Sequence, residues 1–451
     1  MKTQKVELHE FEGFGRKVVF DVAWQGFYEI DSWTDRVLAF CDGRPAEDIV
    51  NQLRSEIPER EVRNILAELE KTYLLMSAGS VTLRPYTPPE KIEILHLDLH
   101  MRADCPPSCV RCYLAKTGKP LHASKQQMTL DIARRAVELL MKESGKLDCY
   151  LTFSGMSTYS DYEWIRNIIN YANKTADRHA KQISFEIVVG SSLFDEKLFA
   201  ENFANQKNLV ITLNIRSLKE IQQILARYSS GFTRSENGPR MGLNIFVDGY
   251  LSTLKELIHQ VIQLFSPQSL YVIPAVIVDS NASATKSNID GAKKLLRELC
   301  EYCLQYALKE GQTWIGHISD QAECMLKRTK YYYYCGAGTR HLAVSPNGEL
   351  YPCAELATDI AHRMGNVQEG ILKDKRRVWL QDYHVDKFET CASCWARYLC
   401  GGGCRVDSLL NCGSLTEINE VTCDLIRYSY ELAMLMSLIY FSGEDEPVHT
   451  F

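Results

Sequence analysis

Sixteen cysteines stand out in this sequence of 451 residues, and the spacing of ten of them indicates metal chemistry. The first group reads Cys105-Pro-Pro-Ser-Cys109-Val-Arg-Cys112. Three thiolates at spacings of four and three in one loop can bind three corners of a cubane iron–sulfur cluster. The fourth iron then has no protein ligand and is free to bind a substrate or cofactor. The alternatives are a zinc loop with a distant fourth ligand, or buried thiols.

A second group of seven cysteines occupies the C-terminal part of the chain. Its members are Cys335, Cys353, Cys391, Cys394, Cys400, Cys404 and Cys423. Seven cysteines in this order are a far more specific signal than one CxxC pair. The alternative is a pair of structural zinc sites. Either way, bound metal would stabilise a segment that is too irregular to have a sufficient core of its own.

The elements that must position these cysteines alternate between strand and helix from residue 92 to residue 311. We expect strands at 92–100, 149–153, 183–189, 209–215, 243–247 and 270–278. Helical patterns lie at 130–142 and 254–265, and a long helix at 291–310 would close the set. This order predicts an α/β fold, a partial (β/α)6 TIM-like barrel. Cys105 follows the first strand, at the end of a barrel where active sites are built.

Smaller units flank the expected barrel. Residues 1–78 combine a hairpin (17–22 and 26–30) with three helices (32–40, 46–55 and 59–73), a winged helix-turn-helix-like pattern. Residues 79–91 are expected to be a linker. Residues 312–451 form the irregular cysteine-rich part, with a hairpin turn at Asn347-Gly348 and a final helix from about Leu425.

Charge and composition exclude several classes of protein. The net charge of −6 and pI near 6.0 leave no basic field for nucleic acid or an anionic membrane. Residues 1–78 are themselves acidic, so peptide binding is a better expectation for them than DNA binding. The N-terminus has no apolar signal region, and the stretch 425–441 carries Arg427 and Glu431, as a buried amphipathic helix does. We therefore expect a cytoplasmic protein with reduced thiols.

The loop Cys105–Cys112, followed by the aromatic Tyr113, resembles the hallmark of the radical S-adenosylmethionine (SAM) superfamily. The resemblance implies that Cys105, Cys109 and Cys112 hold a [4Fe–4S] cluster whose open iron binds SAM. Cleavage of SAM would then give a 5′-deoxyadenosyl radical that abstracts a hydrogen atom. By the same resemblance, Tyr113 would flank the adenine.

One segment departs from the family pattern. The GGEP-like turn expected after the second strand reads Phe153-Ser154-Gly155-Met156-Ser157-Thr158, with a single glycine and no acidic residue. Ser154 and Gly155 remain candidates for receiving the methionine ammonium through backbone carbonyls. Polar residues after later strands could contact the ribose or carboxylate of SAM, or could be ordinary structural residues; they are Ser191, Asn214 and Arg216.

The second cysteine group resembles the SPASM domain, which implies two auxiliary [4Fe–4S] clusters and three clusters in all. Cys335, Cys353 and Cys404 would ligate the nearer one. The outer one would be ligated by Cys391, Cys394, Cys400 and Cys423. Some SPASM proteins have a further cysteine shortly after the first, but the stretch 336–341 has none. The nearer cluster is therefore expected to have an open iron for a substrate thiolate, or to use Cys412 or His341.

Together these features resemble thioether-forming maturases of ribosomally made peptides, of the sactipeptide or ranthipeptide type. Residues 18–22 and the helices after Asp31 resemble a leader-peptide recognition element. The expected partners are a precursor peptide with a leader and a reductant such as flavodoxin or ferredoxin. The alternatives are carbon–carbon crosslinking, oxidation of Ser or Cys to formylglycine, and a non-enzymatic iron–sulfur regulator.

Overall fold

A curved sheet of ten strands forms the centre of the protein, in the order β11-β10-β9-β8-β7-β6-β12-β13-β14-β15. In this computed structural model the described residues are 3–76, 86–102, 127–145, 147–228, 238–247, 254–274, 286–304, 315–357 and 359–441. The first six strands in that order are all parallel. In chain order they are β6 (His96–His100), β7 (Cys149–Ser154), β8 (Ile183–Gly190), β9 (Leu209–Ile215), β10 (Arg240–Val247) and β11 (Ser269–Pro274).

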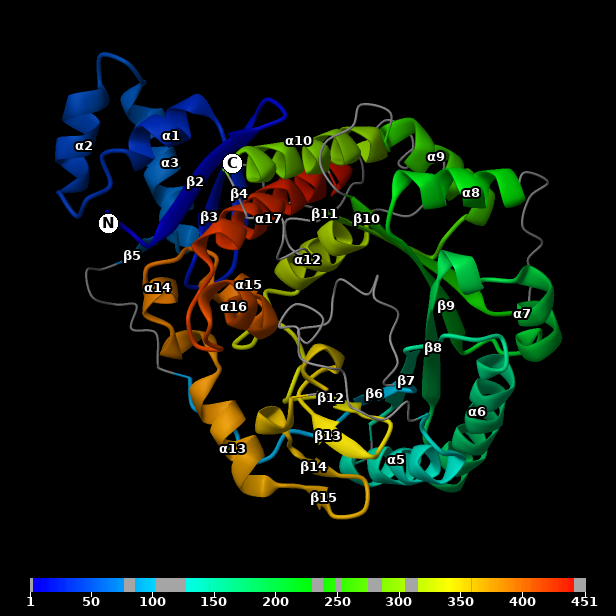
Figure 1. Cartoon of the computed structure of the whole chain (residues 1–451). Helices are drawn as coiled ribbons and strands as arrows, with labels where there is room; N and C mark the ends of the chain where they lie inside the picture. The colour runs from blue at the N-terminus through cyan, green and yellow to red at the C-terminus, as the bar shows by residue number, and fades with distance from the viewer. Residues whose placement is uncertain are drawn as a thin grey trace.

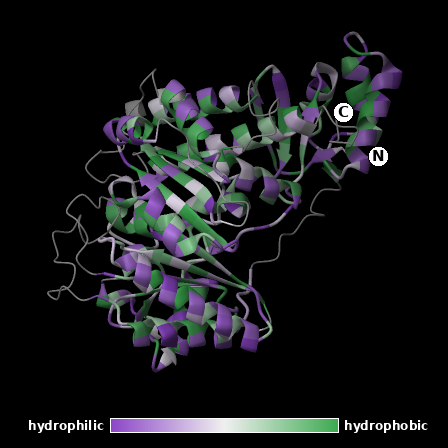
Figure 2. Cartoon of the chain, turned by 90° about the vertical axis from the view of Figure 1, so that its right-hand side faces the viewer, coloured by the Kyte–Doolittle hydropathy of each residue, from purple (hydrophilic) through white to green (hydrophobic). Residues whose placement is uncertain are grey.

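Six helices alternate with these strands and follow the outer face of the curve (Figure 1). They are α5 (Leu130–Glu143), α6 (Asp161–Arg178), α7 (Glu196–Phe203), α8 (Leu218–Arg227), α9 (Leu254–Phe265) and α10 (Lys286–Tyr302). Along β8 every second residue is buried, from Ile183 to Val189, while Glu186 lies on the other face. Figure 2 shows the apolar strands inside the ring of helices, whose outer faces are hydrophilic. The α/β partial barrel expected from the sequence is confirmed.

The cysteine-rich part continues the same sheet. Strand β12 (His341–Val344) is parallel to β6 and pairs His341 with His96. Three further strands extend the sheet beyond β12, each antiparallel to the one before it: β13 (Glu349–Tyr351), β14 (Gly365–Asn366) and β15 (Gly370–Ile371). The hairpin turn at Asn347-Gly348 is confirmed, and Gly348 has φ +88°, a conformation that favours glycine.

Helices complete this C-terminal part of the chain. They are α12 (Gly316–Leu326), α13 (Lys373–Asp382), α14 (Glu389–Ala392), α15 (Arg397–Cys400), α16 (Arg405–Cys412) and α17 (Glu420–Phe441). Helix α17 begins five residues before the expected Leu425 and packs against α10, α12 and strand β2. Among the described helices, none is both long enough and apolar enough to cross a membrane.

The N-terminal residues form a three-stranded sheet with three helices behind it. The strands are β2 (Leu8–Gly13), β3 (Arg16–Asp21) and β4 (Phe27–Ile30), and the helices are α1 (Ser32–Leu38), α2 (Ala46–Leu53) and α3 (Glu59–Lys71). Short strands β1 (Gln4–Lys5) and β5 (Leu75–Met76) pair beside them. The sequence prediction missed β2, whose polar and intermediate residues give weak alternation.

Strand β2 and its neighbours contact the C-terminal part of the chain. The His9 ring stacks on Trp395 with centroids 3.9 Å apart, and Arg397 forms a 2.6 Å ion pair with Glu7. Val18 packs against Leu435 of α17. The domain boundaries at 78, 91 and 311 stay predictions.

Candidate functional site

The turn after β7, one of the expected SAM contacts, is held by a buried carboxylate. The Asp161 side chain is fully buried and accepts hydrogen bonds from the backbone N–H groups of Ser157 and Thr158, each at 3.0 Å. It also forms a 2.8 Å ion pair with Arg102. Burial raises the pKa of Asp161, but the hydrogen bonds and the Arg102 charge outweigh it and hold this pKa below its usual range. The turn is thereby fixed to the residue where the first cysteine loop begins.

That loop itself falls in residues 103–126. Cys105, Cys109, Cys112 and Tyr113 therefore lie outside the residues that the structure describes. Arg102 is the last described residue before them, and Gly155 of the turn lies against it, since a Cβ on Gly155 would be 3.5 Å from the Arg102 backbone nitrogen. Gly155 has φ +74°, so a glycine is favoured here for conformation.

The inner face of the barrel carries polar side chains beside the turn. The Ser154 hydroxyl donates a 2.6 Å hydrogen bond to Asp98. The pKa of Asp98 is raised to about 7, chiefly by burial and also by the nearby carboxylates of Glu186 and Glu355, while the Ser154 hydrogen bond acts against this shift. The sequence prediction missed Asp98, although it stands two residues from the end of the first strand. Asp98 can therefore hold or release a proton near neutral pH.

The remaining expected SAM contacts lie at the ends of β8 and β9. The Ser191 hydroxyl donates to Glu220 at 2.7 Å, and the backbone N–H of Arg216 donates to the same carboxylate at 3.1 Å. Asn214 accepts a 3.0 Å bond from Asn244. Because these are the carboxyl ends of parallel strands, the three residues share one edge of the sheet with Ser154. Their role toward SAM stays a prediction.

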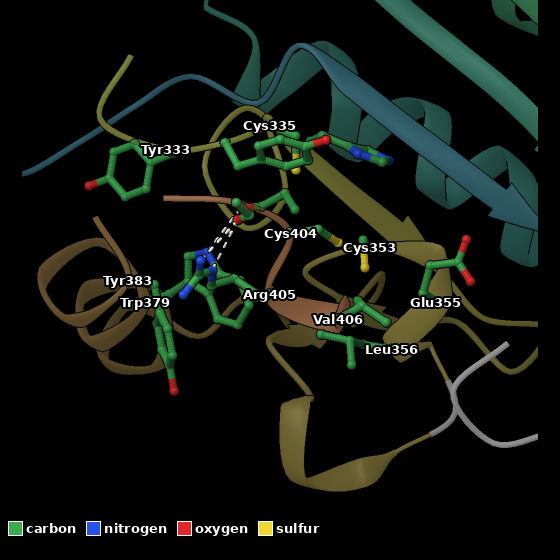
Figure 3. Close-up of a pocket in the computed structure, with 14 residues that line it drawn as sticks. Tyr333, Cys335, Cys353, Glu355, Leu356, Trp379, Tyr383, Cys404, Arg405 and Val406 are labelled. Atoms are coloured by element: carbon green, nitrogen blue, oxygen red, sulfur yellow. Dashed lines mark hydrogen bonds between the residues drawn. The ribbon is translucent and has the colours of Figure 1, made fainter. Parts of the chain in front are cut away.

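Three cysteines of the second group line one cavity of about 200 Å³. They are Cys335, Cys353 and Cys404, drawn in Figure 3 with other lining residues such as Arg405, Trp379 and Tyr383. His341 also lines this cavity, and burial lowers its pKa to about 4. Burial raises the pKa of Cys404 to about 12, and the nearby Cys335 thiol adds to the shift. Such thiols stay protonated unless a cation stabilises the thiolates.

The other four cysteines form a separate set. The pKa of Cys391 is raised to about 12, chiefly by burial and also by the neighbouring thiols of Cys423 and Cys394. Cys400 behaves in the same way, with Cys423 and Cys391 as its neighbours. The seven cysteines thus divide as the SPASM resemblance implies, although their ligand roles stay predictions.

Cys412 lies apart from the other cysteines. Cys404 is the residue before α16 and Cys412 is its last residue, so eight positions at 1.5 Å each separate them by about 12 Å. Burial raises the pKa of Cys412, and the charged neighbours that contribute are Glu417, Asp407 and Arg405. It is not among the described residues that line the cavity.

Arg405 is a partly buried cation that forms no ion pair with a carboxylate among the described residues. Its guanidinium donates to the backbone carbonyls of Gly402, Gly403 and Leu415 and lies 4.1 Å from the centroid of the Phe388 ring. Burial lowers its pKa, and the thiols of both cysteine sets act against that shift. A buried charge is costly without a counter-charge. Two thiolate-bound clusters, which are anionic, would supply one.

The seven cysteines of the second group supply soft thiolate donors, which iron–sulfur clusters and zinc ions both prefer. Within the described ranges, no three His, Cys, Asp or Glu residues are close enough together to hold one metal ion. A cubane places its cysteine ligands farther apart than one tetrahedral ion does, because each thiolate binds a different iron. The thiolate donors fit iron–sulfur clusters, and the presence and number of such clusters stay predictions.

Residues 335–395 match the SPASM iron–sulfur cluster-binding domain. This stretch contains four of the seven cysteines of the second group, beginning at Cys335. A search of curated proteins gives no significant match to the sequence.

Solved structures share the fold of the chain at low sequence identity. The anSMEcpe structure with bound AdoMet is 17% identical, covers 78% of this chain and 96% of its own, and gives a TM-score of 0.57. The anSMEcpe structure with AdoMet and the Cp18Cys peptide is 18% identical over 77% and 99% of the two chains, also with a TM-score of 0.57. Streptococcus suis SuiB bound to precursor peptide SuiA is 16% identical over 93% and 99%, with a TM-score of 0.47. The anSMEcpe matches support the partial barrel with its C-terminal iron–sulfur domain.

Replacing Asp161 by Asn should lower the free energy of unfolding by about 3 kcal/mol, because it removes a fully buried carboxylate that pairs with Arg102 and accepts two backbone hydrogen bonds. Urea unfolding measures the loss. Glu201→Gln is the control, since its 4.0 Å ion pair with Lys197 is exposed and worth at most about 0.5 kcal/mol. Equal effects of the two variants would contradict the role given to Asp161.

Asp98 should make the fold less stable as the pH rises. Its pKa is raised in the folded protein, so the proton stabilises the fold at pH 4 and this contribution is lost as the pH rises through about 7. Asp98→Asn, which mimics the protonated acid, should be more stable than the wild type at pH 8 by up to about 4 kcal/mol. At pH 4 the two proteins should unfold at similar urea concentrations. A stability difference that is the same at both pH values would contradict the assignment.

Proposed function

We propose that this protein is a radical SAM peptide maturase that installs a thioether between a cysteine sulfur and a carbon of a ribosomally made precursor peptide. The SPASM match and the shared fold support the coarser conclusion, a radical SAM enzyme with an iron–sulfur domain that modifies peptides. The observation that carries the proposal is the cavity lined by Cys335, Cys353 and Cys404, which also includes His341, the first residue of the strand that pairs with β6.

Each group of residues has a distinct task in this proposal. Cys105, Cys109 and Cys112 hold the first [4Fe–4S] cluster, and the second cysteine group holds two more. When bound, the first cluster and SAM supply the radical that abstracts a hydrogen atom from the peptide. The Asp161–Arg102 pair positions the Ser154-Gly155 turn for the methionine end of SAM. Glu220 fixes Ser191 and the backbone of Arg216 near the expected ribose.

The barrel interior and the cysteine-rich part would then act on the peptide. Asp98 can take up a proton released when a cysteine thiol becomes a thioether, because its pKa is near 7. The partly buried cation Arg405 lies beside both cysteine sets, where it would stabilise the negative charge of bound clusters that could accept the surplus electron. The electrons that begin the cycle would come from a flavodoxin or ferredoxin.

The N-terminal sheet would hold the leader of the precursor. Strand β4 is one edge of this sheet, and an extended peptide can add to such an edge by backbone hydrogen bonds. Two exposed tryptophans flank β4 in sequence: Trp24, 53% exposed, and Trp33, 43% exposed. They could contact apolar side chains of the added strand. Because the unit packs on α17 and Trp395, a bound leader would raise the concentration of the core peptide near the barrel.

Cleavage of SAM tests the radical assignment. The reconstituted, reduced protein should convert SAM to 5′-deoxyadenosine and methionine, and Cys109→Ala should abolish this because the first cluster loses a ligand. Cys412→Ala is the matched control and should keep the activity. Chromatography of the nucleoside products measures both. Residual turnover in Cys109→Ala at the wild-type rate would overturn the assignment.

Formation of the thioether is detected by analysing the modified peptide. A cysteine-containing precursor co-expressed with the protein should lose two hydrogens per crosslink, and the cysteine should no longer react with iodoacetamide. Mass spectrometry of peptide fragments locates the bond. A loss of two hydrogens with the cysteine still alkylated would instead support a carbon–carbon crosslink.

Trp33→Ala should weaken leader binding at least tenfold, the loss expected when a large aromatic contact is removed. Tyr159→Ala, a change at a similarly exposed aromatic residue next to the barrel helix α6, is the control and should leave leader binding unchanged. Fluorescence anisotropy of a labelled leader peptide measures both. Unchanged binding in Trp33→Ala would show that the leader does not pass this end of β4.

A further inference from the structure

His341, one of the residues that line the three-cysteine cavity, has a buried ring nitrogen with no partner among the described residues. Its Nε2 atom is buried and makes no hydrogen bond to any residue that the structure describes, and His341 lines the cavity together with Cys335, Cys353 and Cys404. Leaving a buried polar nitrogen unsatisfied costs about 1–3 kcal/mol. The cost of this unsatisfied imidazole nitrogen, at a cavity that three thiols also line, has to be offset by some interaction.

The backbone and the ring of His341 are both fixed. Its N–H donates to the Gly336 carbonyl at 2.8 Å, and its own carbonyl accepts from Gly338 at 2.9 Å, so the loop after Cys335 closes on His341. The ring stacks on His96 with centroids 4.2 Å apart and an interplanar angle of 12°. Pairing of β12 with β6 holds both rings in register. An imidazole held in this way is preorganised to act as a ligand.

We infer that Nε2 of His341 is the fourth ligand of the cluster held by Cys335, Cys353 and Cys404. The inference rests on the proposed function only in requiring that this cluster is present. Histidine is an established ligand of iron–sulfur centres, where it replaces cysteine and raises the reduction potential. Cys412, at the far end of α16, is the less suitable ligand.

Ligation by His341 would determine what the nearer cluster can bind. With His341 bound, every iron of the nearer cluster has a protein ligand, so a substrate thiolate does not bind there unless the imidazole leaves. The cluster then serves electron transfer. Its reduction potential should be higher than that of a variant with four cysteines.

Pulsed electron paramagnetic resonance on protein with [¹⁵N]histidine tests this directly. The full chain carries Cys105→Ala, Cys109→Ala and Cys112→Ala, so that only auxiliary clusters are reduced and observed. We expect a strong nitrogen coupling that changes with the isotope and is lost in His341→Ala. Adding imidazole to His341→Ala should restore it. His341→Cys should keep the iron content and shift the midpoint potential of one cluster to lower values.

His384→Ala is the matched control, because the Nδ1 atom of His384 is also buried and without a partner, yet His384 is not among the described residues lining the cavity. The His384→Ala variant should keep the nitrogen coupling. Auxiliary clusters that form normally but lack any histidine coupling would overturn the inference and leave the proposed function intact. Failure to assemble auxiliary clusters at all, in a chain that is folded by circular dichroism, would overturn both.

Discussion

The pairing of β12 with β6 is the interaction on which the rest of the structure depends. Strand β6 ends at His100, and the first cysteine group follows it in the sequence from Cys105. Along its other edge it pairs with β12, whose first residue, His341, lines the three-cysteine cavity. One strand of five residues therefore connects both expected reaction centres. A shift of this register by one residue would turn His341 away from the cavity, because strand side chains alternate between faces.

The segment from Cys335 to Cys423 explains why metal is needed for more than redox chemistry. Its helices α14, α15 and α16 have four to eight residues each, too few to be stable by themselves. At its centre lies Arg405, a charged group that contacts backbone carbonyls and one aromatic ring. Thiolate-bound clusters would stabilise both features, by crosslinking short elements and by supplying negative charge to the partly buried cation.

The sequence predicted the barrel well because its strands are strongly patterned. Residues 209–215 were expected as a strand, and β9 has the same bounds. The resemblance to the SPASM domain implied a division of the thiols into two sets, and their ligand roles stay predictions. Arg405, Asp161 and Asp98 were missed, since their importance comes from burial and from partners far away in the chain. Arg102 and Asp161, for example, are separated by 59 positions.

The expected ligands of the nearer cluster also show that a sequence does not reveal contacts made in the folded protein. Cys412 was the more attractive candidate by residue type, and His341 the less attractive one. Spacing along the chain carries no information on which atom faces a cavity. The length of α16 and the unsatisfied Nε2 of His341 reverse that preference.

Iron and acid-labile sulfide per chain, measured after anaerobic reconstitution, test the central claim most directly. The account predicts about twelve of each, the content of three [4Fe–4S] clusters. It also predicts that Cys353→Ala lowers the content by about four, because one cluster loses a ligand from its cavity. About four irons in the wild-type protein, accompanied by zinc, would contradict the account and leave a radical enzyme with a structural zinc segment.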